Sequence, residues 1–512
     1  MTTPHQKLAE SLDALRQLQG EGRRVFQSRE FKRLDRERLL KNGFLQEVML
    51  GWLISASPQT REGDSTPWYA SFWEFCALYC NERFRSAWYL SPEQSLLLLA
   101  EQTVVPTQVI ICSPNGANNK IALPFGTSIY DLKQSPMPPT TDLTVKDGLR
   151  VFSNPAALIR IPEQFFRTNP IEVRIALENI RDASEVLSRL LEGGHSFIAG
   201  RISGAFRHVN RADVADEILK TMKAAGFDVR ETNPFQDEPR PLPSRPSPPI
   251  VTRLQALWEA TRSTVLEVFP EAPLRPEKDT YLKSIDEIYT RDAYNSLSIE
   301  GYSVSRELIE RVQSGDWNPD NIEADRQQRD ALAARGYWQA FQNVKANVAQ
   351  VIDGANAGAL VRASHRDWYR ELFQPCAAAG IIPISALAGY RNHRVFLRGS
   401  RHVPPAWESV PDAMPAFFDL LESEPSPAVR AVLGHWLFGF VHPYPDGNGR
   451  IARFLMNTML ASGGYPWTVI RIEDRKAYLA ALEDASVNTD IRPFATFIVE
   501  SMNRPLNRIS ES

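Results

Sequence analysis

Apolar residues recur at three- and four-residue spacing through most of the C-terminal half of the 512-residue chain. That spacing places side chains on one face of an α-helix, so the pattern predicts a helical region. The predicted helices span 250–268, 278–300, 305–313, 323–352, 365–379, 412–424, 426–441, 449–462, 474–486 and 491–502. One segment, 389–403, has instead the pattern of a β-hairpin. The C-terminal half is therefore expected to be all-α with a single hairpin.

The N-terminal half mixes helical and alternating patterns. Two amphipathic segments, 7–18 and 29–41, precede an apolar hairpin at 44–54, and this order indicates a winged helix-turn-helix. Further predicted elements are strands at 104–113 and 120–133 and helices at 171–192 and 211–226. The predicted fold class is mainly α, with an α+β N-terminal region that contains the winged helix.

A proline-rich stretch separates the two halves. Residues 234–249 contain seven prolines in sixteen positions. Proline lacks the amide donor and fixes φ, so this stretch cannot lie inside a helix or a central strand and should be an extended spacer. The predicted division is a winged helix at 1–60, an α+β domain at 61–232, a linker at 233–250 and a helical domain at 251–505.

Composition narrows the class of protein. The formal net charge is −3 and hydrophobic content is 43%, which fits a globular protein and gives no overall signature of nucleic-acid binding. No apolar stretch approaches the roughly 20 residues that span a bilayer, and the N-terminus lacks a secretory signal pattern. The four cysteines are too few for a disulfide framework. We expect buried thiols, with Cys76 and Cys80 on one helical face, and a cytoplasmic location.

The most informative segment follows the helix predicted at 426–441. Pro443 and Pro445 end that helix, so His442 should lie where a buried helix opens into a loop. The segment 446–449 then leads into the next helix, and its two glycines allow successive backbone amides to form an anion-binding nest.

Two arginines begin that next helix. Arg450 and Arg453 share one face of its first turn, where the helix dipole disfavours cations by about 0.3–1 kcal/mol each. Their position makes sense if they meet a bound polyanion, beside which Asp446 would hold a divalent cation. These residues point to phosphoryl or nucleotidyl transfer with a histidine base.

Residues 442–453, HPYPDGNGRIAR, resemble the signature of the Fic family of all-helical AMP transferases, His-Pro-Phe-x-(Asp/Glu)-Gly-Asn-Gly-Arg-x-x-Arg. The resemblance extends over about residues 250–500. It implies ATP as substrate and Mg²⁺ as cofactor, and the 389–403 hairpin resembles the family's flap, which clamps a target segment by strand addition. Tyr444 stands where the family usually has Phe, and we expect this difference to have a small effect.

The resemblance also implies a role for each motif residue. His442 would deprotonate a hydroxyl of the target protein, and Asp446 would bind Mg²⁺ between the α- and β-phosphates. The nucleotide phosphates would be held by Gly447, Asn448, Gly449 and Arg450, with Arg453 reaching the γ-phosphate. His435 lies seven residues before His442 without such a motif, and we interpret it as a histidine of the core or one that packs behind the site residues.

An upstream segment predicts autoinhibition. Glu300 ends the helix predicted at 278–300, where the dipole disfavours an anion, and Gly301 is a natural helix-stop residue. Ser296, Glu300 and Gly301 resemble the Fic inhibitory motif, (Ser/Thr)-x-x-x-Glu-(Gly/Asn), on an inhibitory helix near 282–301. By this resemblance Glu300 pairs with Arg453 and blocks productive binding of the γ-phosphate.

The N-terminal half suggests a second function. Residues 23–41 carry eight Lys or Arg against three acids, and the segment resembles the winged helix of abortive-infection antitoxins. Residues 23–54 could then contact DNA. Two hypotheses follow: an autoinhibited transferase of AMP to a Ser, Thr or Tyr hydroxyl of a protein, or a DNA-binding or toxin–antitoxin-like regulator whose Fic half is a sensor. Use of another nucleotide and removal of AMP remain variants of the first. The sequence indicates no oligomeric state.

Overall fold

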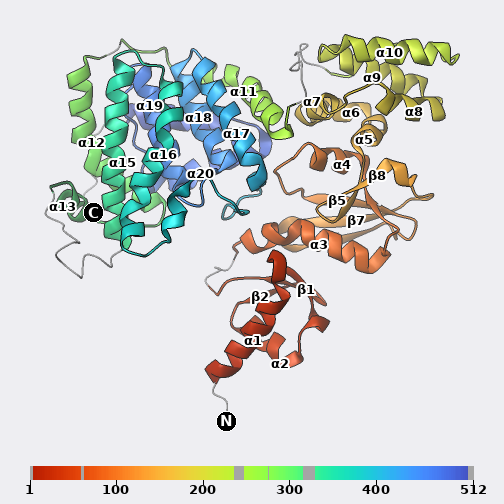
Figure 1. The fold of residues 1–512 in the computed structure, drawn as a ribbon, viewed down its shortest axis with the longest axis horizontal. Helices are drawn as coiled ribbons and strands as arrows, with labels where there is room; N and C mark the ends of the chain where they lie inside the picture. Colours follow the sequence, from red (N-terminus) through yellow and green to blue (C-terminus); the bar gives the residue numbers. More distant parts are fainter. Residues whose placement is uncertain (1–3, 59–62, 236–246, 275, 315–328, 505–512) are drawn as a thin grey trace. The chain divides into compact units, whose positions relative to one another are not determined.

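The computed structural model describes residues 4–58, 63–235, 247–274, 276–314 and 329–504 (Figure 1). The chain divides into two compact units. Unit 1 consists of Met1–Pro249 together with Phe396–Val403, and unit 2 consists of Ile250–Val395 and Pro404–Ser512. Most of the predicted linker falls on residues 236–246, which lie outside the described residues.

Unit 1 begins with a small helical and sheet module. Helices α1 (Pro4–Leu18) and α2 (Arg33–Lys41) accompany strands β1 (Val25–Gln27), β2 (Leu45–Met49) and β3 (Trp52–Ser55). The strands form an antiparallel sheet in the order β1-β3-β2. The two predicted helices and the predicted hairpin are present, and β1 is an added strand. Phe26, Leu39 and Leu53 belong to the module's buried core.

A second sheet follows helix α3 (Thr66–Phe84), which is apolar nearly all round and buries Cys76 and Cys80. The strands are β4 (Tyr89–Leu90), β5 (Gln108–Ser113), β6 (Asn119–Ala122) and β7 (Ser128–Lys133), in the order β4-β5-β7-β6. Only β5 and β7 pair in parallel. The single strand predicted at 120–133 is therefore two strands around a turn. Strands β8 (Leu143–Lys146) and β9 (Leu149–Phe152) form a separate antiparallel pair.

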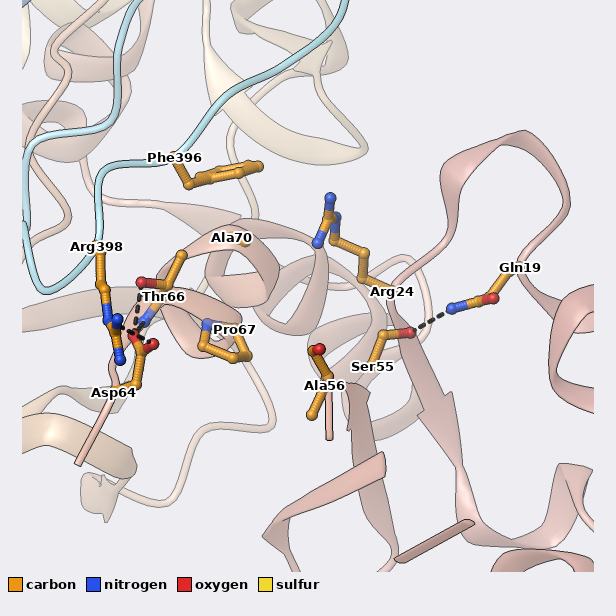
Figure 2. Close-up of a pocket in the computed structure, with 11 residues that line it drawn as sticks. Gln19, Arg24, Ser55, Ala56, Asp64, Thr66, Pro67, Ala70, Phe396 and Arg398 are labelled. Carbon is orange, nitrogen blue, oxygen red and sulfur yellow. Dashed lines mark hydrogen bonds and ion pairs between the residues drawn. The ribbon is translucent and has the colours of Figure 1, made fainter. Parts of the chain in front are cut away.

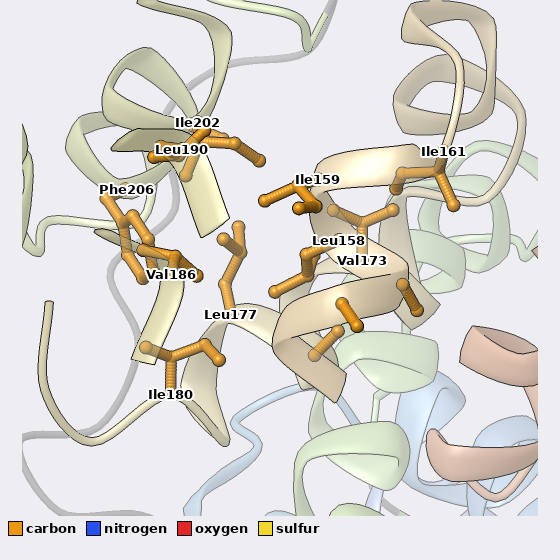
Figure 3. Close-up of a cluster of buried hydrophobic side chains, with 14 of the residues drawn as sticks. Leu158, Ile159, Ile161, Val173, Leu177, Ile180, Val186, Leu190, Ile202 and Phe206 are labelled. Atoms are coloured by element: carbon orange, nitrogen blue, oxygen red, sulfur yellow. The ribbon is translucent and has the colours of Figure 1, made fainter. Parts of the chain in front are cut away.

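Short helices complete unit 1 around an aliphatic core (Figure 3). They are α4 (Pro92–Leu99), α5 (Asn154–Arg160), α6 (Glu163–Thr168), α7 (Pro170–Glu178), α8 (Ser184–Glu192), α9 (Ser196–His208) and α10 (Ala212–Ala224). The helix predicted at 171–192 is thus divided in two. Leu177 of α7 and Val186 of α8 both point into the shared core, so the break lets both apolar faces turn inward.

The described residues of unit 2 form helices joined by loops, with no strand among them. Its helices are α11 (Pro249–Val268), α12 (Lys278–Ile299), α13 (Arg306–Ser314), α15 (Arg329–Ile352), α16 (Ala357–Ala378), α17 (Val410–Ser423), α18 (Pro427–Val441), α19 (Asn448–Ser462), α20 (Arg475–Asn488) and α21 (Arg492–Asn503). Helices α18 and α19 are buried along most of their length, so the loop between them opens from the core. Among all described helices, none is long and apolar enough to cross a membrane.

The segment 389–403 differs from its prediction. It forms no hairpin, and the tip Phe396–Val403 belongs to unit 1. The backbone N–H of Val105 donates to the carbonyl of Arg401 at 2.9 Å, and that of Val403 donates to the carbonyl of Thr103 at 2.8 Å. The prediction of a hairpin at 389–403 is therefore wrong, because the backbone groups of residues 401–403 pair with residues 103–105 and not with another strand of the same segment.

Candidate functional site

His442 caps the C-terminus of α18 in a left-handed conformation, with φ 51° and ψ 59°. A residue other than glycine in this region costs about 1–3 kcal/mol, so surrounding contacts must hold it. Its backbone N–H donates to the carbonyl of Phe438 at 2.9 Å, and its Nδ1 lies 3.4 Å from the carbonyl oxygen of Gly439. Burial, and secondarily the charge of Arg391, lowers the pKa of His442 to about 4. The imidazole is therefore neutral at pH 7 and can accept a proton.

The loop after His442 is closed by Asn448. The side chain of Asn448 accepts from the backbone N–H of Tyr444 at 2.9 Å and donates to the carbonyl of Tyr444 at 2.8 Å. Helix α19 begins at this asparagine, one residue before the predicted start, and Gly447 precedes it with φ 80°. The Asn448 side chain thus fixes the loop, and what the first turn of α19 offers an anion is its backbone N–H groups.

Tyr444 is fully buried, and its ring stacks on Tyr369 with centroids 4.0 Å apart and planes 8° apart. Among the described residues its hydroxyl has no hydrogen-bond partner. Burial raises the pKa of this hydroxyl above its ordinary value. The ring is therefore well packed, whereas the added oxygen pays a desolvation cost without a compensating contact.

Arg450 is buried to 0% exposure in the first turn of α19. Its guanidinium carbon lies 4.9 Å from the ring centroid of Phe373 and 5.2 Å from that of Tyr302. The Asp446 carboxylate is 3.7 Å away, but none of the three guanidinium nitrogens has a hydrogen-bond partner among the described residues. A buried cation with every donor unused fits an anion that must come from outside the chain.

Arg453, three residues further along α19, donates hydrogen bonds through two of its three guanidinium nitrogens. Its Nε donates to Oγ of Ser296 at 2.9 Å, and its Nη2 donates to the Ser296 carbonyl at 3.1 Å and to Oε1 of Glu300 at 2.6 Å. Burial alone would raise the pKa of Glu300, but the charges of Arg453 and Arg450 outweigh it and lower this pKa below its usual range. The structure thus brings together Ser296, Glu300 and Arg453, as the sequence predicts.

Two glycines allow this approach. A Cβ on Gly449 would lie 2.3 Å from Oε1 of Glu300, so only glycine leaves room for the carboxylate. Gly301, with φ 88°, reverses the chain after α12, and the N–H of Tyr302 then donates to the carbonyl of Leu297 at 3.1 Å. This turn places Tyr302 over Arg450. One helix end therefore contacts both arginines.

Asp446 suits an open divalent-cation site. Its side chain is 55% exposed, and Oδ1 accepts from the backbone N–H of Gly447 at 2.6 Å. Within the described ranges, no group of three or more His, Cys, Asp or Glu side chains could hold a metal alone. A single exposed carboxylate fits Mg²⁺, which binds through one or two carboxylates plus substrate phosphates and keeps several waters.

Two further residues near His442 are His435, which was expected in the sequence, and Arg391, which was not. His435 is buried, and its Nε2 lies 2.7 Å from the Tyr478 hydroxyl, consistent with the core role expected for it. Sequence reasoning missed Arg391, whose buried guanidinium contacts the carbonyl of His442 at 2.8 Å. Arg391 lies 51 residues away in the chain, so no local spacing could indicate this contact.

A pocket of about 500 Å³ lies in unit 1 (Figure 2). Nε of Arg398 is 3.2 Å from the Asp64 carboxylate in its wall, and the guanidinium of Arg24 lies over the Phe396 ring. None of the residues predicted for the site lines this pocket.

The α18–α19 loop joins a neutral histidine, an exposed carboxylate and a buried cation, which is the arrangement of a phosphate-handling site. Residues 359–460 match the Fic/DOC family, so the chain carries a Fic/DOC domain. The match includes His442, Asp446, Arg450 and Arg453, whereas Glu300 lies upstream of it.

Curated relatives share this region. Over 122 residues, 23% of this chain, it is 42% identical to protein adenylyltransferase Fic of Nematostella vectensis, covering 28% of that protein. It is 38% identical to the protein of the same name from Drosophila willistoni, covering 24% of it. The chain thus spans about a quarter of the length of the curated relatives it matches.

Solved structures with some likeness also carry the Fic name. A Fic-1 fragment from C. elegans aligns with a TM-score of 0.36 at 18% identity, covering 65% of this chain and 93% of that one. A Fic domain-containing signalling protein from Bacteroides thetaiotaomicron aligns with a TM-score of 0.34 at 20% identity, covering 49% and 92%.

Proposed function

We propose that this protein is an adenylyltransferase that moves AMP from ATP to a Ser, Thr or Tyr hydroxyl of a protein and is held inactive by Glu300. The observation that carries the proposal is Arg450, a buried guanidinium with no hydrogen-bond partner among the described residues, at the start of α19. The helix N-terminus and this cation together favour a phosphate.

The proposed reaction assigns a role to each neighbour. The neutral imidazole of His442 takes the proton of the target hydroxyl, whose oxygen attacks the α-phosphorus of ATP as pyrophosphate leaves. Asp446 would hold Mg²⁺, which supplies neutralisation of phosphate charge when bound. The N–H groups of residues 447–449 and the Arg450 guanidinium position the phosphates. Positioning and charge stabilisation supply most of the catalysis in such transfers.

The proposed inhibition rests on competition for Arg453. The Nε and Nη2 atoms of this guanidinium already donate to Ser296 and Glu300, so a γ-phosphate must compete for these two donors. The Tyr302 ring over Arg450 adds a second contact from the same helix end. Release of this helix end from α19 would free both arginines together.

Intact mass measurement tests the reaction class. The Glu300→Gly chain is incubated with Mg²⁺ and ATP, and in parallel with GTP, CTP or UTP. We expect the mass of one AMP to be added from ATP, at a rate that His442→Ala in the same background lowers about 10²–10⁴-fold. Glu287→Gln, an exposed change on α12, is the matched control and should behave as the wild type.

Three results would contradict the proposal. They are no nucleotide added by any variant, addition of phosphate alone, and equal labelling with and without His442. Preferential labelling from another nucleotide would keep the transfer and overturn the assignment of ATP. Loss of AMP from a previously labelled chain would show the reverse reaction instead.

We propose DNA binding through residues 23–54 as a second candidate function, which the two helices and the antiparallel sheet of the first module of unit 1 support. The charge pairing of this module gives less support to DNA binding, because four of its arginines are already paired with carboxylates. Arg23 pairs with Glu30, Arg29 with Glu82, Arg33 with Glu37 and Arg38 with Asp35. Retention of the full-length chain on duplex DNA, lost steeply as salt rises, would support this function. Failure of the chain to bind duplex DNA at low salt would contradict the proposed DNA binding.

We also propose a cytoplasmic location. All four cysteines are free and buried, although Cys76 and Cys80 lie one turn apart in α3. This fits a reducing compartment. Fractionation of cells that produce the chain tests it, and recovery from an oxidising compartment would contradict it.

A further inference from the structure

The guanidinium of Arg391 is buried against four backbone carbonyls. Nε donates to His442 at 2.8 Å, Nη1 to His393 at 3.1 Å, and Nη2 to Pro405 at 2.5 Å and Val441 at 3.3 Å. Its own backbone N–H donates to the carbonyl of Pro443 at 2.9 Å. One residue thus binds three successive carbonyls, those of residues 441–443.

The carbonyls of residues 441–443 need hydrogen-bond donors from outside α18. The last carbonyls of a helix have no partner within it, and His442 turns the chain out of the helical path. Pro443 and Pro445 have no N–H to offer. The fork of an arginine has five donors at fixed angles, and its charge is favoured at a helix C-terminus. A lysine has three donors on one nitrogen, so it cannot reproduce four contacts that are spread over the three nitrogens of the guanidinium.

The other two carbonyls lie on the two sides of one excursion of the chain. His393 precedes the tip Phe396–Val403 and Pro405 follows it, so Arg391 joins the base of this excursion to the end of α18. Burial lowers the pKa of Arg391 to about 10, so the charge is retained at neutral pH at some cost. A role in packing alone would be served as well by an uncharged side chain of similar length.

We propose that Arg391 is a positioning residue that holds the backbone of His442 in its left-handed turn and fixes the base of the 393–405 excursion against it. The inference rests on the proposed function of His442. Arg391 is more than 50 residues from the motif in the chain and acts through the backbone, not on the nucleotide. Its loss should therefore lower turnover while leaving ATP binding intact.

The test compares Arg391→Lys and Arg391→Ala in the Glu300→Gly chain. A misplacement of about 1 Å can cost on the order of 10²-fold in rate, so kcat should fall by about that factor with KM for ATP unchanged. Guanidinium ion at millimolar concentration should restore part of the activity of Arg391→Ala and none of that of Arg391→Lys.

Arg430→Lys is the matched control. Arg430 lies in the first turn of the same helix and donates to the Glu424 carbonyl at 2.6 Å and to Ser462 at 2.9 Å, two partners outside residues 442–453. It should keep kcat even if thermal stability falls. Equal losses of kcat in Arg391→Lys and Arg430→Lys, or a rise in KM with kcat unchanged, would overturn the positioning role.

A second measurement separates this inference from the proposed function. If the Glu300→Gly chain transfers no AMP, NMR of the imidazole of His442 still reports its environment. Arg391→Lys should shift the His442 signals and leave those of His435, which is in the core, unchanged. Unchanged His442 signals would overturn the inference, whatever reaction the chain catalyses.

Discussion

Two helix ends in unit 2 carry charges that their dipoles disfavour, and they differ in how those charges are satisfied. The last turn of α12 places Glu300 at a negative end, and the first turn of α19 places Arg450 and Arg453 at a positive end. Glu300 and Arg453 satisfy each other at 2.6 Å. The Arg450 guanidinium lies 3.7 Å from the Asp446 carboxylate but has no hydrogen-bond partner among the described residues.

The difference separates regulation from binding. A disfavoured charge that finds its partner inside the chain forms a contact that a ligand must displace. A disfavoured charge whose donors make no hydrogen bond within the chain can donate them to a ligand. We therefore propose that Arg453 is held by Glu300 in the inhibited state and that Arg450 binds a phosphate, although both arginines lie on one face of a single turn.

The largest expected effect is on stability: replacing each arginine by methionine should change the free energy of unfolding in opposite directions. Arg450→Met removes buried donors without partners and should raise the free energy of unfolding by about 1–3 kcal/mol. Arg453→Met removes hydrogen bonds to a charged group and should lower it by a similar amount. Denaturant unfolding of the two variants without nucleotide measures both. Shifts of the same sign would break the comparison.

The second-largest expected effect is the pH dependence that follows from the lowered pKa of His442. Its lowering to about 4 predicts that the imidazole is still neutral at pH 5.5, where a histidine of ordinary pKa 6.5 would be only about one-tenth neutral. Because the folded pKa lies below the unfolded one, this group contributes stability above pH 6.5, which is lost as the pH falls toward 4. NMR titration, assigned with His442→Gln, measures it directly. A midpoint near 6.5 would show that the imidazole is not desolvated.

Gly449→Ala should release Glu300 without changing it. The new Cβ would lie 2.3 Å from Oε1, and the flexible carboxylate is the group that can move. We expect AMP transfer to rise about 5-fold, the low end of typical coupling between sites. In the Glu300→Gly background the same change should add nothing, since there is no carboxylate to displace. Equal activation in both backgrounds would exclude this mechanism.

Tyr444→Phe should have the smallest effect. It removes a buried hydroxyl without a partner among the described residues and keeps the ring stacked on Tyr369. Stability should rise by about 1 kcal/mol with activity unchanged, measured by thermal unfolding and by the transfer assay. A loss of stability would reveal a hydrogen bond that the hydroxyl makes in solution.

The sequence indicates the site well because its residues lie close together. Twelve consecutive positions contain His442, Asp446, Arg450 and Arg453, and helix dipoles show which charges need partners. Most helices of unit 2 follow their apolar spacing. The structure adds that the side chain of Asn448 closes the loop, while its backbone N–H keeps the proposed place in the nest.

What the sequence did not show depends on contacts between distant segments. Arg391 reaches His442, and Tyr302 covers Arg450, through tertiary packing that leaves no periodic pattern. Helix α3 is apolar nearly all round and has no amphipathic signal to detect. Residues 401–403, at the end of the segment predicted as a hairpin, pair with residues 103–105, a partner that the sequence pattern alone cannot specify.

The rate of AMP transfer by Glu300→Gly relative to the wild-type chain tests the central claim most directly. Coupling between sites typically changes affinity about 5–150-fold, and we expect the rate to rise within that range because Arg453 becomes free to meet the γ-phosphate. Equal rates for the two chains, with His442 required in both, would show an active transferase in which the Glu300–Arg453 pair is not inhibitory.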